Sequence, residues 1–356
     1  MIRRIYLNHK SYCLNFLFLL IIIFFPITGV ADQSSTVNVL VWFGYLNSPW
    51  ISKMVKDDCN VDLSYDEFNS NSDFLRRLKA QNSNYDIIIF SDTVFSAVNH
   101  NIALNKSDLW KQSFGYNKYI RQEYIKSKFP KNVVYFMQSL TGFDWNPDTI
   151  SLSSNDSIST IFRKAKTNSV IMIDDPEEVE MLLQLSNANM EASGNASKET
   201  FTLDNFKKLT QNAKIYISNQ SNQIFNRKDF AFAYQWSGAS LFERNANITH
   251  RFLIEPQLSY VSSDLLANLN NKPSTVCVAK LLSSKEFLSR LQNESYYFSP
   301  YGDIGHVPPG EYRDMYTQFL KELPHLKWIK SYSLSDFESI DQKWKLIKVQ
   351  LQNENP

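Results

Sequence analysis

The sequence predicts an α/β protein with two domains, and three observations lead to this fold class. Short apolar runs that are typical of strands alternate with amphipathic stretches that are typical of helices over residues 37–90. The same alternation starts again at residue 157 and continues to residue 245. The chain has 356 residues, which is enough for about two domains of ordinary size. We therefore expect two α/β lobes.

The first block predicts three strands separated by two helices. Its third strand, over residues 86–90, is a short and mostly apolar run, as in parallel strands whose two faces are both covered. Pro49 suits the first turn of the first helix, and Asn71 or Ser72 can cap the second. The predicted elements are strands over 37–43, 61–68 and 86–90 and helices over 49–56 and 71–81.

The second block follows a connecting region. A strand over residues 133–136 leads into residues 142–147, which we expect to cross from one lobe to the other. Residues 193–197 and 268–273 are polar and predict loops. The predicted elements are helices over 157–166 and 175–188, a strand over 170–173, and segments over 203–212, 230–234 and 237–245 that continue the alternation.

The N-terminal segment, residues 1–31, predicts a secretory signal peptide. Three basic residues make its start positive, ten uninterrupted apolar residues follow over 16–25, and small residues lead to Ala31. The apolar run is too short for a membrane span, which needs about 20 residues. No cysteine comes directly after it, so a lipoprotein anchor is not indicated. We expect cleavage near Ala31 and a soluble protein in the periplasm; an uncleaved anchor is the alternative.

The charge balance argues against a nucleic-acid-binding surface. The chain has 37 Lys and Arg residues against 36 Asp and Glu residues. Removing residues 1–31 leaves 34 basic against 36 acidic residues, a net charge of −2. Proteins that bind nucleic acid usually carry a clear basic excess, so we expect no nucleic-acid partner.

Two cysteines, Cys59 and Cys277, remain after signal cleavage. In an oxidising compartment they could form a disulfide. They could equally be two separate buried thiols, because sequence alone does not give their distance.

Signatures of catalytic and metal sites are weak in this chain. Only 9 Gly residues occur, with no Gly-rich phosphate loop and no nucleophile turn, and no His-Glu-x-x-His pattern occurs among the 5 His residues. Asp303 and His306 could form a metal pair, although a polar loop is the simpler interpretation. Tyr296 and Tyr297 could hold ferric iron, although packed aromatic rings are the simpler interpretation. We expect no cofactor, no metal and no enzymatic activity.

The acidic stretch over residues 174–178, Asp-Asp-Pro-Glu-Glu, lies between an apolar strand and an amphipathic helix. As a structural signal it predicts Asp175 as N-cap, Pro176 as the first helical residue and Glu178 as the partner in a capping box. As a functional signal it places carboxylates at a strand end, where open α/β sheets bind ligands. Both interpretations stand together, because four acidic residues exceed what one cap requires.

Aromatic residues are abundant, with 25 Phe, 18 Tyr and 7 Trp. Several are expected at strand ends or in loops, where a cleft of aromatic faces and a few carboxylates would suit an organic ammonium ligand. The alternative for each is ordinary core packing. These residues are Trp42, Tyr45, Trp236, Tyr260, Tyr296, Tyr297 and Tyr301.

The chain resembles the spermidine/putrescine-binding family of extracytoplasmic solute-binding proteins of ABC importers. The resemblance covers about residues 36–350 in consistent order. The acidic stretch matches a family pattern whose second Asp and Glu, here Asp175 and Glu178, meet ligand nitrogens. The other matching segments are residues 40–45 with Trp42 and Tyr45, residues 85–91 ending in Ser91, residues 234–238 with Trp236, and residues 297–300 with Tyr297.

The chain departs from the family's pattern in three places. The family's hinge strand usually carries Trp-Met-Asp, and the best match here is residues 260–262, Tyr-Val-Ser, so that Ser262 replaces an acid that pairs with the ligand amine. Thr93 stands where a cleft Tyr is common, and Phe43 and Gly44 replace Thr and Glu. One lost buried carboxylate would cost a cation roughly a few kcal/mol.

The resemblance implies the two-lobed periplasmic-binding-protein fold, type II-like. Each lobe would be a mixed, mostly parallel sheet flanked by helices, and two crossovers would form the hinge. Lobe one would contain residues 36–138 and 260–312. Lobe two would contain residues 139–259 and 313–356, with the C-terminal helices beside it.

The resemblance also implies a function. A monomer would capture a small organic cation, such as spermidine or putrescine, between the lobes and deliver it to an ABC permease in the inner membrane. The alternatives are a periplasmic sensor subunit that signals to a membrane receptor, a ferric or anion carrier, and an exported enzyme on the same scaffold. The implied ligand-binding residues are Trp42, Tyr45, Ser91, Asp175, Glu178, Trp236, Tyr260, Ser262 and Tyr297.

Overall fold

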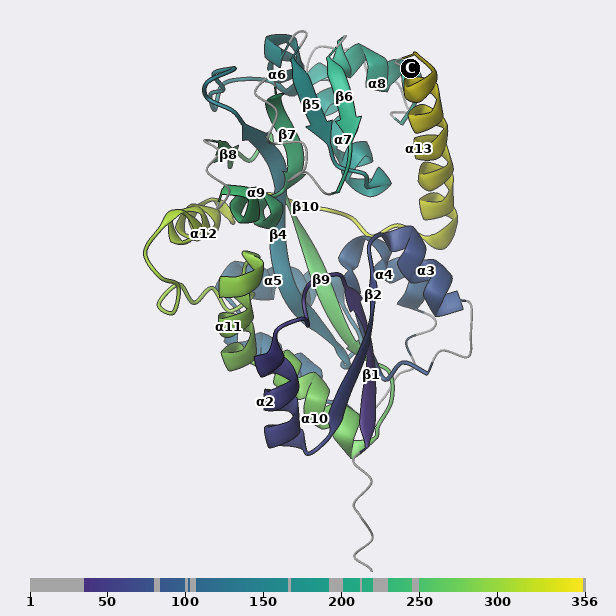
Figure 1. Ribbon diagram of the computed structural model, residues 1–356, viewed down its shortest axis with the longest axis vertical. Coiled ribbons are helices and arrows are strands. Elements are labelled where there is room, and N and C mark those ends of the chain that lie inside the picture. Colours follow the sequence, from purple (N-terminus) through teal and green to yellow (C-terminus); the bar gives the residue numbers. More distant parts are fainter. Residues whose placement is uncertain are drawn as a thin grey trace, which may run out of the picture. The chain divides into compact units, whose positions relative to one another are not determined.

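A ten-stranded sheet runs through the described part of the chain (Figure 1). The computed structural model describes residues 35–79, 84–99, 102, 107–165, 168–191, 201–211, 213–219, 230–244 and 250–354. Thr36–Pro356 form one unit and Met1–Ser35 another. The predicted signal peptide lies outside the described residues.

The strands agree with most of the predicted apolar runs. They are β1 (Thr36–Trp42), β2 (Asp62–Phe68), β3 (Ile87–Ser91), β4 (Val133–Trp145), β5 (Ser169–Met172), β6 (Lys214–Ile217), β7 (Phe230–Trp236), β8 (Arg251–Leu253), β9 (Tyr260–Asn268) and β10 (Lys327–Trp328). Their order is β2-β1-β3-β9-β4-β7-β5-β6, with β10 beside β9 and β8 beside β4.

The two ends of the sheet are parallel and its centre is antiparallel. β1 lies between β2 and β3 in parallel pairing, and β5 lies between β6 and β7 in the same way. β9 and β4 run antiparallel to each other and to β3 and β7. Each parallel end has its own main cluster of buried apolar side chains. The sheet is therefore the two-lobed, mixed α/β arrangement that the sequence predicts.

β4 and β9 connect the two lobes (Figure 1). β4 pairs with β9 from Val133 to Thr141 and with β7 from Thr141 to Trp145. β9 begins at Tyr260, opposite Thr141, and pairs with β3 only from Asp264 onward. The predicted crossover at residues 142–147 is therefore mostly strand. Its Gln, Ser, Thr and Asp residues break the apolar pattern, so the sequence predicts only a short strand here. All thirteen residues of β4 are nevertheless buried.

The helices cover the sheet. They are α2 (Pro49–Cys59), α3 (Asn71–Lys79), α4 (Phe95–Val98), α5 (Lys118–Ser127), α6 (Ile158–Ala165), α7 (Pro176–Glu191), α8 (Leu203–Thr210), α9 (Ser237–Arg244), α10 (Pro273–Leu282), α11 (Lys285–Ser295), α12 (Glu311–Glu322) and α13 (Leu334–Glu354), with short 3-10 turns η1 (Asp92–Val94) and η3 (Leu109–Gly115). Four predicted helices are observed as α2, α3, α6 and α7, with ends shifted by up to three residues. The predicted loop at residues 193–197 lies outside the described residues.

The C-terminal helix α13 packs against both lobes. Its Phe337 belongs to the apolar cluster of the first lobe and its Trp344 to that of the second, and the helix contacts both α4 and α7. In contrast, α12 places Tyr316 and Phe319 in the first cluster only. Residues 313–322 thus pack with the first lobe's core, whereas α13 bridges the two.

Cys59 and Cys277 form a disulfide, with 5.8 Å between their Cα atoms. It joins the C-terminal end of α2 to α10, both within the first lobe. Of the two possibilities that the sequence left open, the structure shows the paired one. The bridge closes a loop of 218 residues, which restricts the unfolded chain.

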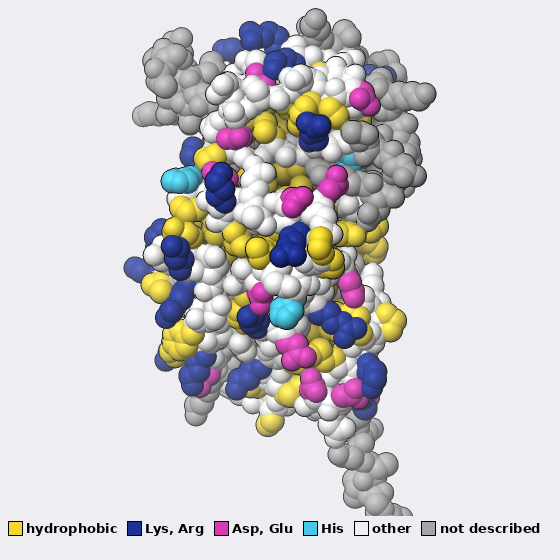
Figure 2. Space-filling view, turned by 90° about the vertical axis from the view of Figure 1, so that its left-hand side faces the viewer, with side chains coloured by type: hydrophobic (Ala, Val, Ile, Leu, Met, Phe, Trp, Pro, Cys, Tyr) yellow, Lys and Arg dark blue, Asp and Glu magenta, His cyan; other side chains and the backbone are white. Residues whose placement is uncertain are grey.

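The surface carries mixed charge. Figure 2 shows basic and acidic side chains interspersed over one face, as the balanced composition leads one to expect. None of the helices in the described ranges combines the length and the apolar character needed to cross a bilayer.

Candidate functional site

Most of the predicted site residues lie where strands of both lobes end beside the hinge. Trp42 ends β1, Ser91 ends β3 and Trp236 ends β7. The acidic stretch follows β5 and opens α7. Carboxyl ends of parallel strands commonly border a ligand site. Here each lobe has such strand ends, and β4 and β9 lie between the two lobes.

Glu178 binds aromatic side chains from two strands. Its Oε1 accepts a hydrogen bond from Trp236 Nε1 at 3.0 Å, and its Oε2 accepts one from the Tyr260 hydroxyl. Tyr234 donates in turn to the Tyr260 oxygen at 3.2 Å. Burial raises the pKa of Glu178 to about 7, helped by the charge of Asp175 and opposed by the donated hydrogen bonds. The protonated form of this carboxyl is therefore favoured relative to an exposed Glu.

Asp175 caps α7, as predicted. Its Oδ1 accepts a hydrogen bond from the backbone N–H of Glu178 at 3.3 Å. The reciprocal half of the predicted capping box is wrong, because the Glu178 carboxyl points to Trp236 and Tyr260 instead. Burial raises the pKa of Asp175, while hydrogen bonds from the Glu177 side chain and the helix N–H groups lower it.

Glu177 is fully buried and reaches into the opposite lobe. Its Oε1 accepts from Asn71 Nδ2 at 3.0 Å and from Thr93 Oγ1 at 3.5 Å. Burial, the nearby Asp175 charge and the hydrogen bond to Asp175 all hold the pKa of Glu177 well above its usual range. The protonated form of Glu177 is therefore favoured, and it can donate to Asp175. The sequence gives no specific role to Glu177 beyond its place among four acidic residues.

Asp264 is a carboxyl group that the sequence analysis missed. It lies on β9 opposite Ser91, two residues after Ser262, so that Ser262 and Asp264 share one face of the strand. Its Oδ2 accepts from the Tyr45 hydroxyl at 2.5 Å. Burial raises the pKa of Asp264 to about 7, whereas the hydrogen bond from Tyr45 and the nearby Trp42 indole lower it.

The position of Asp264 corrects the expectation that the hinge strand lacks an acid. The motif match was taken at residues 260–262, and the acid stands one strand period later, at the end of residues 262–264. Testing the neighbouring register with the same side-chain orientation would have found it.

Aromatic rings from both lobes meet across the hinge. The Trp42 and Trp236 rings, one from each lobe, are 6.2 Å apart in an edge-to-face arrangement. The Tyr45 and Tyr297 rings, both of the first lobe, are 5.8 Å apart. The Tyr297 ring lies against Gly238, where a Cβ atom would come within 2.7 Å of it. Gly238 is therefore needed for this approach. Aromatic faces beside carboxyl groups suit organic ammonium ions.

Ser91 and Ser262 bond to neighbouring side chains. Ser91 Oγ lies 2.9 Å from Thr93 Oγ1 and caps η1. Ser262 Oγ lies 2.8 Å from Ser139 Oγ on β4. Both hydroxyls thus have partners in the hinge region, and contact with a ligand remains a prediction for them.

Asp174 is separated from the other acids of its stretch. Its carboxylate accepts from Trp344 Nε1 at 2.7 Å and from Lys348 Nζ at 2.7 Å, both on α13. Three acids of residues 174–178 therefore face the hinge, and Asp174 anchors the C-terminal helix to the second lobe.

Five carboxyl groups share this region without a basic partner. Burial is the largest cause of a raised pKa for each of them, and no basic side chain of the described residues contributes to any of the five. A buried carboxylate without a counter-charge is strongly unfavourable. The cluster therefore needs either protons or a cation. Its members are Asp92, Asp175, Glu177, Glu178 and Asp264.

The residues of the possible metal sites have other partners. The Tyr296 ring packs on Tyr312 at 5.7 Å, whereas the Tyr297 ring packs on Tyr45. Asp303 forms a 2.8 Å ion pair with Lys285. Within the described ranges, no group of three or more His, Cys, Asp or Glu side chains could hold a metal ion.

A buried acid–histidine pair lies in the second lobe. Asp144 Oδ1 is 2.6 Å from His250 Nδ1, and its Oδ2 accepts from Gln235 Nε2 at 2.9 Å. The Asp144 and His250 side chains are both fully buried. The pair therefore packs inside the lobe, out of reach of a substrate.

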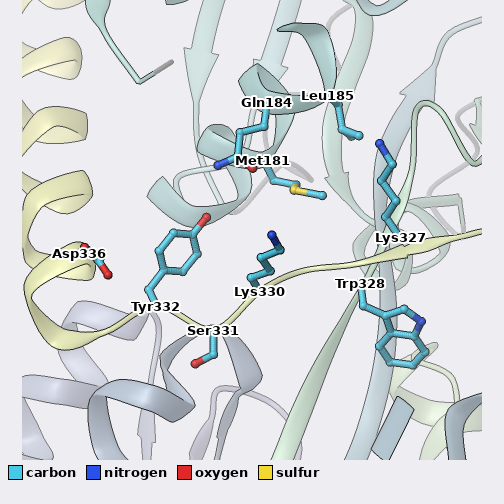
Figure 3. A pocket seen from close by; sticks show the side chains of 9 residues that line it. All are labelled: Met181, Gln184, Leu185, Lys327, Trp328, Lys330, Ser331, Tyr332 and Asp336. Atoms are coloured by element: carbon cyan, nitrogen blue, oxygen red, sulfur yellow. The ribbon is translucent and has the colours of Figure 1, made fainter. Parts of the chain in front are cut away.

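A separate cavity of 590 Å³ lies between α7 and the chain segment that leads into α13 (Figure 3). In Figure 3 the side chains of Met181 and Gln184 lie opposite those of Lys330 and Tyr332. Its lining residues are Met181, Gln184, Leu185, Lys327, Trp328, Lys330, Ser331, Tyr332 and Asp336. None of the nine predicted site residues lines it.

Comparison of the whole fold with solved structures gives consistent matches. The spermidine/putrescine ABC transporter substrate-binding protein PotD from Streptococcus pneumoniae matches with a TM-score of 0.69 and 16% identity over 90% of this chain and 99% of that chain. The Tp0655 (TpPotD) lipoprotein of Treponema pallidum matches with a TM-score of 0.63 and 16% identity over 89% and 99%. The binding protein MotA from A. tumefaciens B6, in complex with glucopine, matches with a TM-score of 0.67 and 11% identity over 88% and 99%.

Comparison by sequence finds no relative, whereas comparison by fold does. No family model and no curated relative matches this sequence. Identities of 11–16% carry the fold alone. The chain therefore has the two-lobed fold of the extracytoplasmic solute-binding proteins of ABC importers.

Proposed function

We propose that this chain is an exported solute-binding protein that captures a small organic cation of the polyamine type and delivers it to an ABC permease. The observation that carries this proposal is the cluster of five carboxyl groups beside aromatic rings at the hinge, with no basic partner among the described residues. A ligand with several ammonium groups would supply the missing positive charge. Export to the periplasm, with cleavage near Ala31, is part of the proposal.

The similar folds support transport but leave the ligand open. Two of the matched proteins are named for spermidine and putrescine, or for PotD, whereas MotA was solved with glucopine. The fold therefore accommodates different solutes, and the side chains of the site must select among them. In this chain those side chains are acidic and aromatic, which favours a cation over a neutral or anionic solute.

We propose that lobe one comprises residues 36–138 and 260–312 and that lobe two comprises residues 139–259 together with the C-terminal helices. The ligand would lie between them and favour the closed form by contacting both. Lobe one would supply Trp42, Tyr45, Ser91, Tyr297 and, as an addition to the sequence prediction, Asp264. Lobe two would supply Asp175, Glu178 and Trp236, and the hinge strand Tyr260 and Ser262.

Calorimetric titration tests the proposal directly. Spermidine and putrescine are titrated into the protein, with uncharged 1,4-butanediol as the control ligand. The double variant Asp175→Asn/Glu178→Gln is expected to bind at least tenfold more weakly, a loss of about 1.4 kcal/mol. Glu286→Gln, at an exposed position on α11, is the matched control and keeps the original affinity.

Thermal unfolding of the double variant is measured alongside, because Asp175 also caps α7. Absence of heat with both amines contradicts the polyamine class. Unchanged affinity in the double variant contradicts the assignment of the site. Native mass spectrometry of protein purified without refolding then identifies the solute that it carries.

A further inference from the structure

The hydrogen bond between Glu177 and Asn71 crosses from one lobe to the other. Glu177 lies in the first turn of α7, and Asn71 begins α3 in the first lobe. Their side chains meet at 3.0 Å, and Thr93 of η1 adds a longer contact at 3.5 Å. Glu177 is fully buried and Asn71 is 3% exposed. The bond therefore forms only when the lobes are together.

The first lobe offers Glu177 neutral donors and no positive charge. Thr93 and Asn71 are uncharged, and the carbonyl of Thr93 is held by the N–H of Tyr332 at 2.6 Å. The remaining neighbour of the Glu177 carboxyl is Asp175, which is itself an acid. An ionised Glu177 would therefore keep its charge uncompensated in the closed form.

The charged and titratable groups on the neighbouring described elements supply no positive charge to Glu177. Those of α7 are Asp175, Glu178 and Glu180, which are acidic, and that of the segment before α13 is Tyr332, which bonds to Glu180. Asp92 on η1 is itself buried. Basic side chains of α3 and α13 form ion pairs with other acids, as Arg77 with Asp73, Lys345 with Asp341 and Lys79 with Glu338.

We propose that Glu177 is a proton-dependent clasp that holds the two lobes closed in the absence of ligand at acidic pH and releases them when it ionises. The protonated acid donates to Asp175 and accepts from Asn71 at the same time. Loss of the proton leaves a buried negative charge beside other acids, and opening of the lobes relieves it by admitting water. Glu177 is thus a positioning residue for closure, whatever solute the cleft takes.

The linkage fixes the direction of the effect. The closed form binds the Glu177 proton more tightly than the open form does, because only the closed form buries the group. The ratio of closed to open protein therefore falls as pH rises, by up to about tenfold per pH unit over the range in which the two forms differ by one proton.

Glu177→Gln separates this group from the other acids. Glutamine keeps an oxygen that accepts from Asn71 and an N–H that donates to Asp175, and it has no proton to lose. Small-angle X-ray scattering of ligand-free protein is recorded from pH 5 to pH 8.5. We expect the radius of gyration of the unsubstituted protein to rise with pH. That of Glu177→Gln should rise less, because the variant lacks the one proton that Glu177 releases on opening. Glu286→Gln is the matched control and follows the unsubstituted protein.

Asn71→Ala provides a second test from the opposite lobe, leaving α7 intact. It is expected to be more open than the unsubstituted protein at pH 5 and equal to it at pH 8.5. Identical pH profiles for Glu177→Gln and the unsubstituted protein would overturn the clasp, as would an Asn71→Ala variant that stays closed at pH 5. No ligand is present, so the outcome is independent of whether polyamines bind.

Discussion

Two carboxyl groups, one from each lobe, reach the same pKa by different means. Burial brings both Glu178 and Asp264 to about 7. Glu178 lies in the first turn of the sixteen-residue helix α7, where the helix dipole favours negative charge, and its carboxyl accepts from the side chains of Trp236 and Tyr260. Asp264 lies within a strand whose backbone groups bond to β3 and β4, so only the side chains of Tyr45 and Trp42 stabilise its charge. Both carboxyl groups thus depend on side-chain hydrogen bonds, and only Glu178 has a helix N-terminus in addition.

The covalent link is the largest difference between the lobes. The disulfide Cys59–Cys277 lies in the first lobe, and the remaining cysteine, Cys13, lies outside the described residues. Replacing Cys59 and Cys277 by Ser is expected to lower the free energy of unfolding by about 2–5 kcal/mol, because the unfolded chain regains its freedom. Denaturant unfolding with hydrogen exchange measures the loss. Exchange should accelerate in α2 and α10 more than in α6 and α7, and uniform acceleration would contradict this localisation.

The pH dependence of stability tests the two acids together. Both have pKa values raised on folding, so the folded protein holds protons that the unfolded chain has released above about pH 4.5. Stability of the ligand-free protein therefore falls as pH rises through about 7, by about 1.4 kcal/mol for each unit by which a folded pKa exceeds its unfolded value. Differential scanning calorimetry from pH 5 to pH 8 measures it. Glu178→Gln and Asp264→Asn should each flatten the profile, and a melting temperature that rises with pH in this window contradicts the assignment.

Ligand affinity compares the two acids separately. Asp264→Asn is expected to weaken spermidine binding about 10- to 100-fold, or about 1.4–2.7 kcal/mol, because one charge-assisted contact becomes neutral. Titration calorimetry at pH 8, where Asp264 is ionised, gives the largest difference. The loss should shrink toward pH 5.5, where the carboxyl of the unsubstituted protein is protonated. A loss that is independent of pH would indicate a structural role for Asp264.

The phenol groups give the smallest and sharpest test. Tyr45→Phe removes the hydroxyl that donates to Asp264 and should weaken binding by about 0.5–1.5 kcal/mol. Tyr260→Phe should cost less, because Glu178 keeps the Trp236 bond and the helix N-terminus. Equal losses in the two variants would contradict the additional support that Glu178 receives from Trp236 and the helix N-terminus.

The sequence predicted the elements whose signal is local. The apolar β3 run and the cap at Asp175 were read correctly, because periodicity and capping depend on neighbouring residues. β4 was predicted too short, because its polar residues are buried only through pairing with distant strands. The sequence does not point to Asp264, because the motif matches at residues 260–262. A shift of two residues keeps the same strand face and reaches the acid. The contact between Glu177 and Asn71 joins residues 106 apart, and no local pattern indicates it.

The pairing of β4 with β9 restricts how the lobes move. Both connections are neighbouring ribbons of the same sheet, joined by main-chain bonds from Val133 to Thr141, rather than two independent swivels. A twisting of one lobe about the other would shear this ladder, whereas flexing normal to the sheet keeps it intact. We therefore expect the two paired strands to bend in one direction only. The lobes would then open and close by the same hinge motion, which brings the same side chains back together.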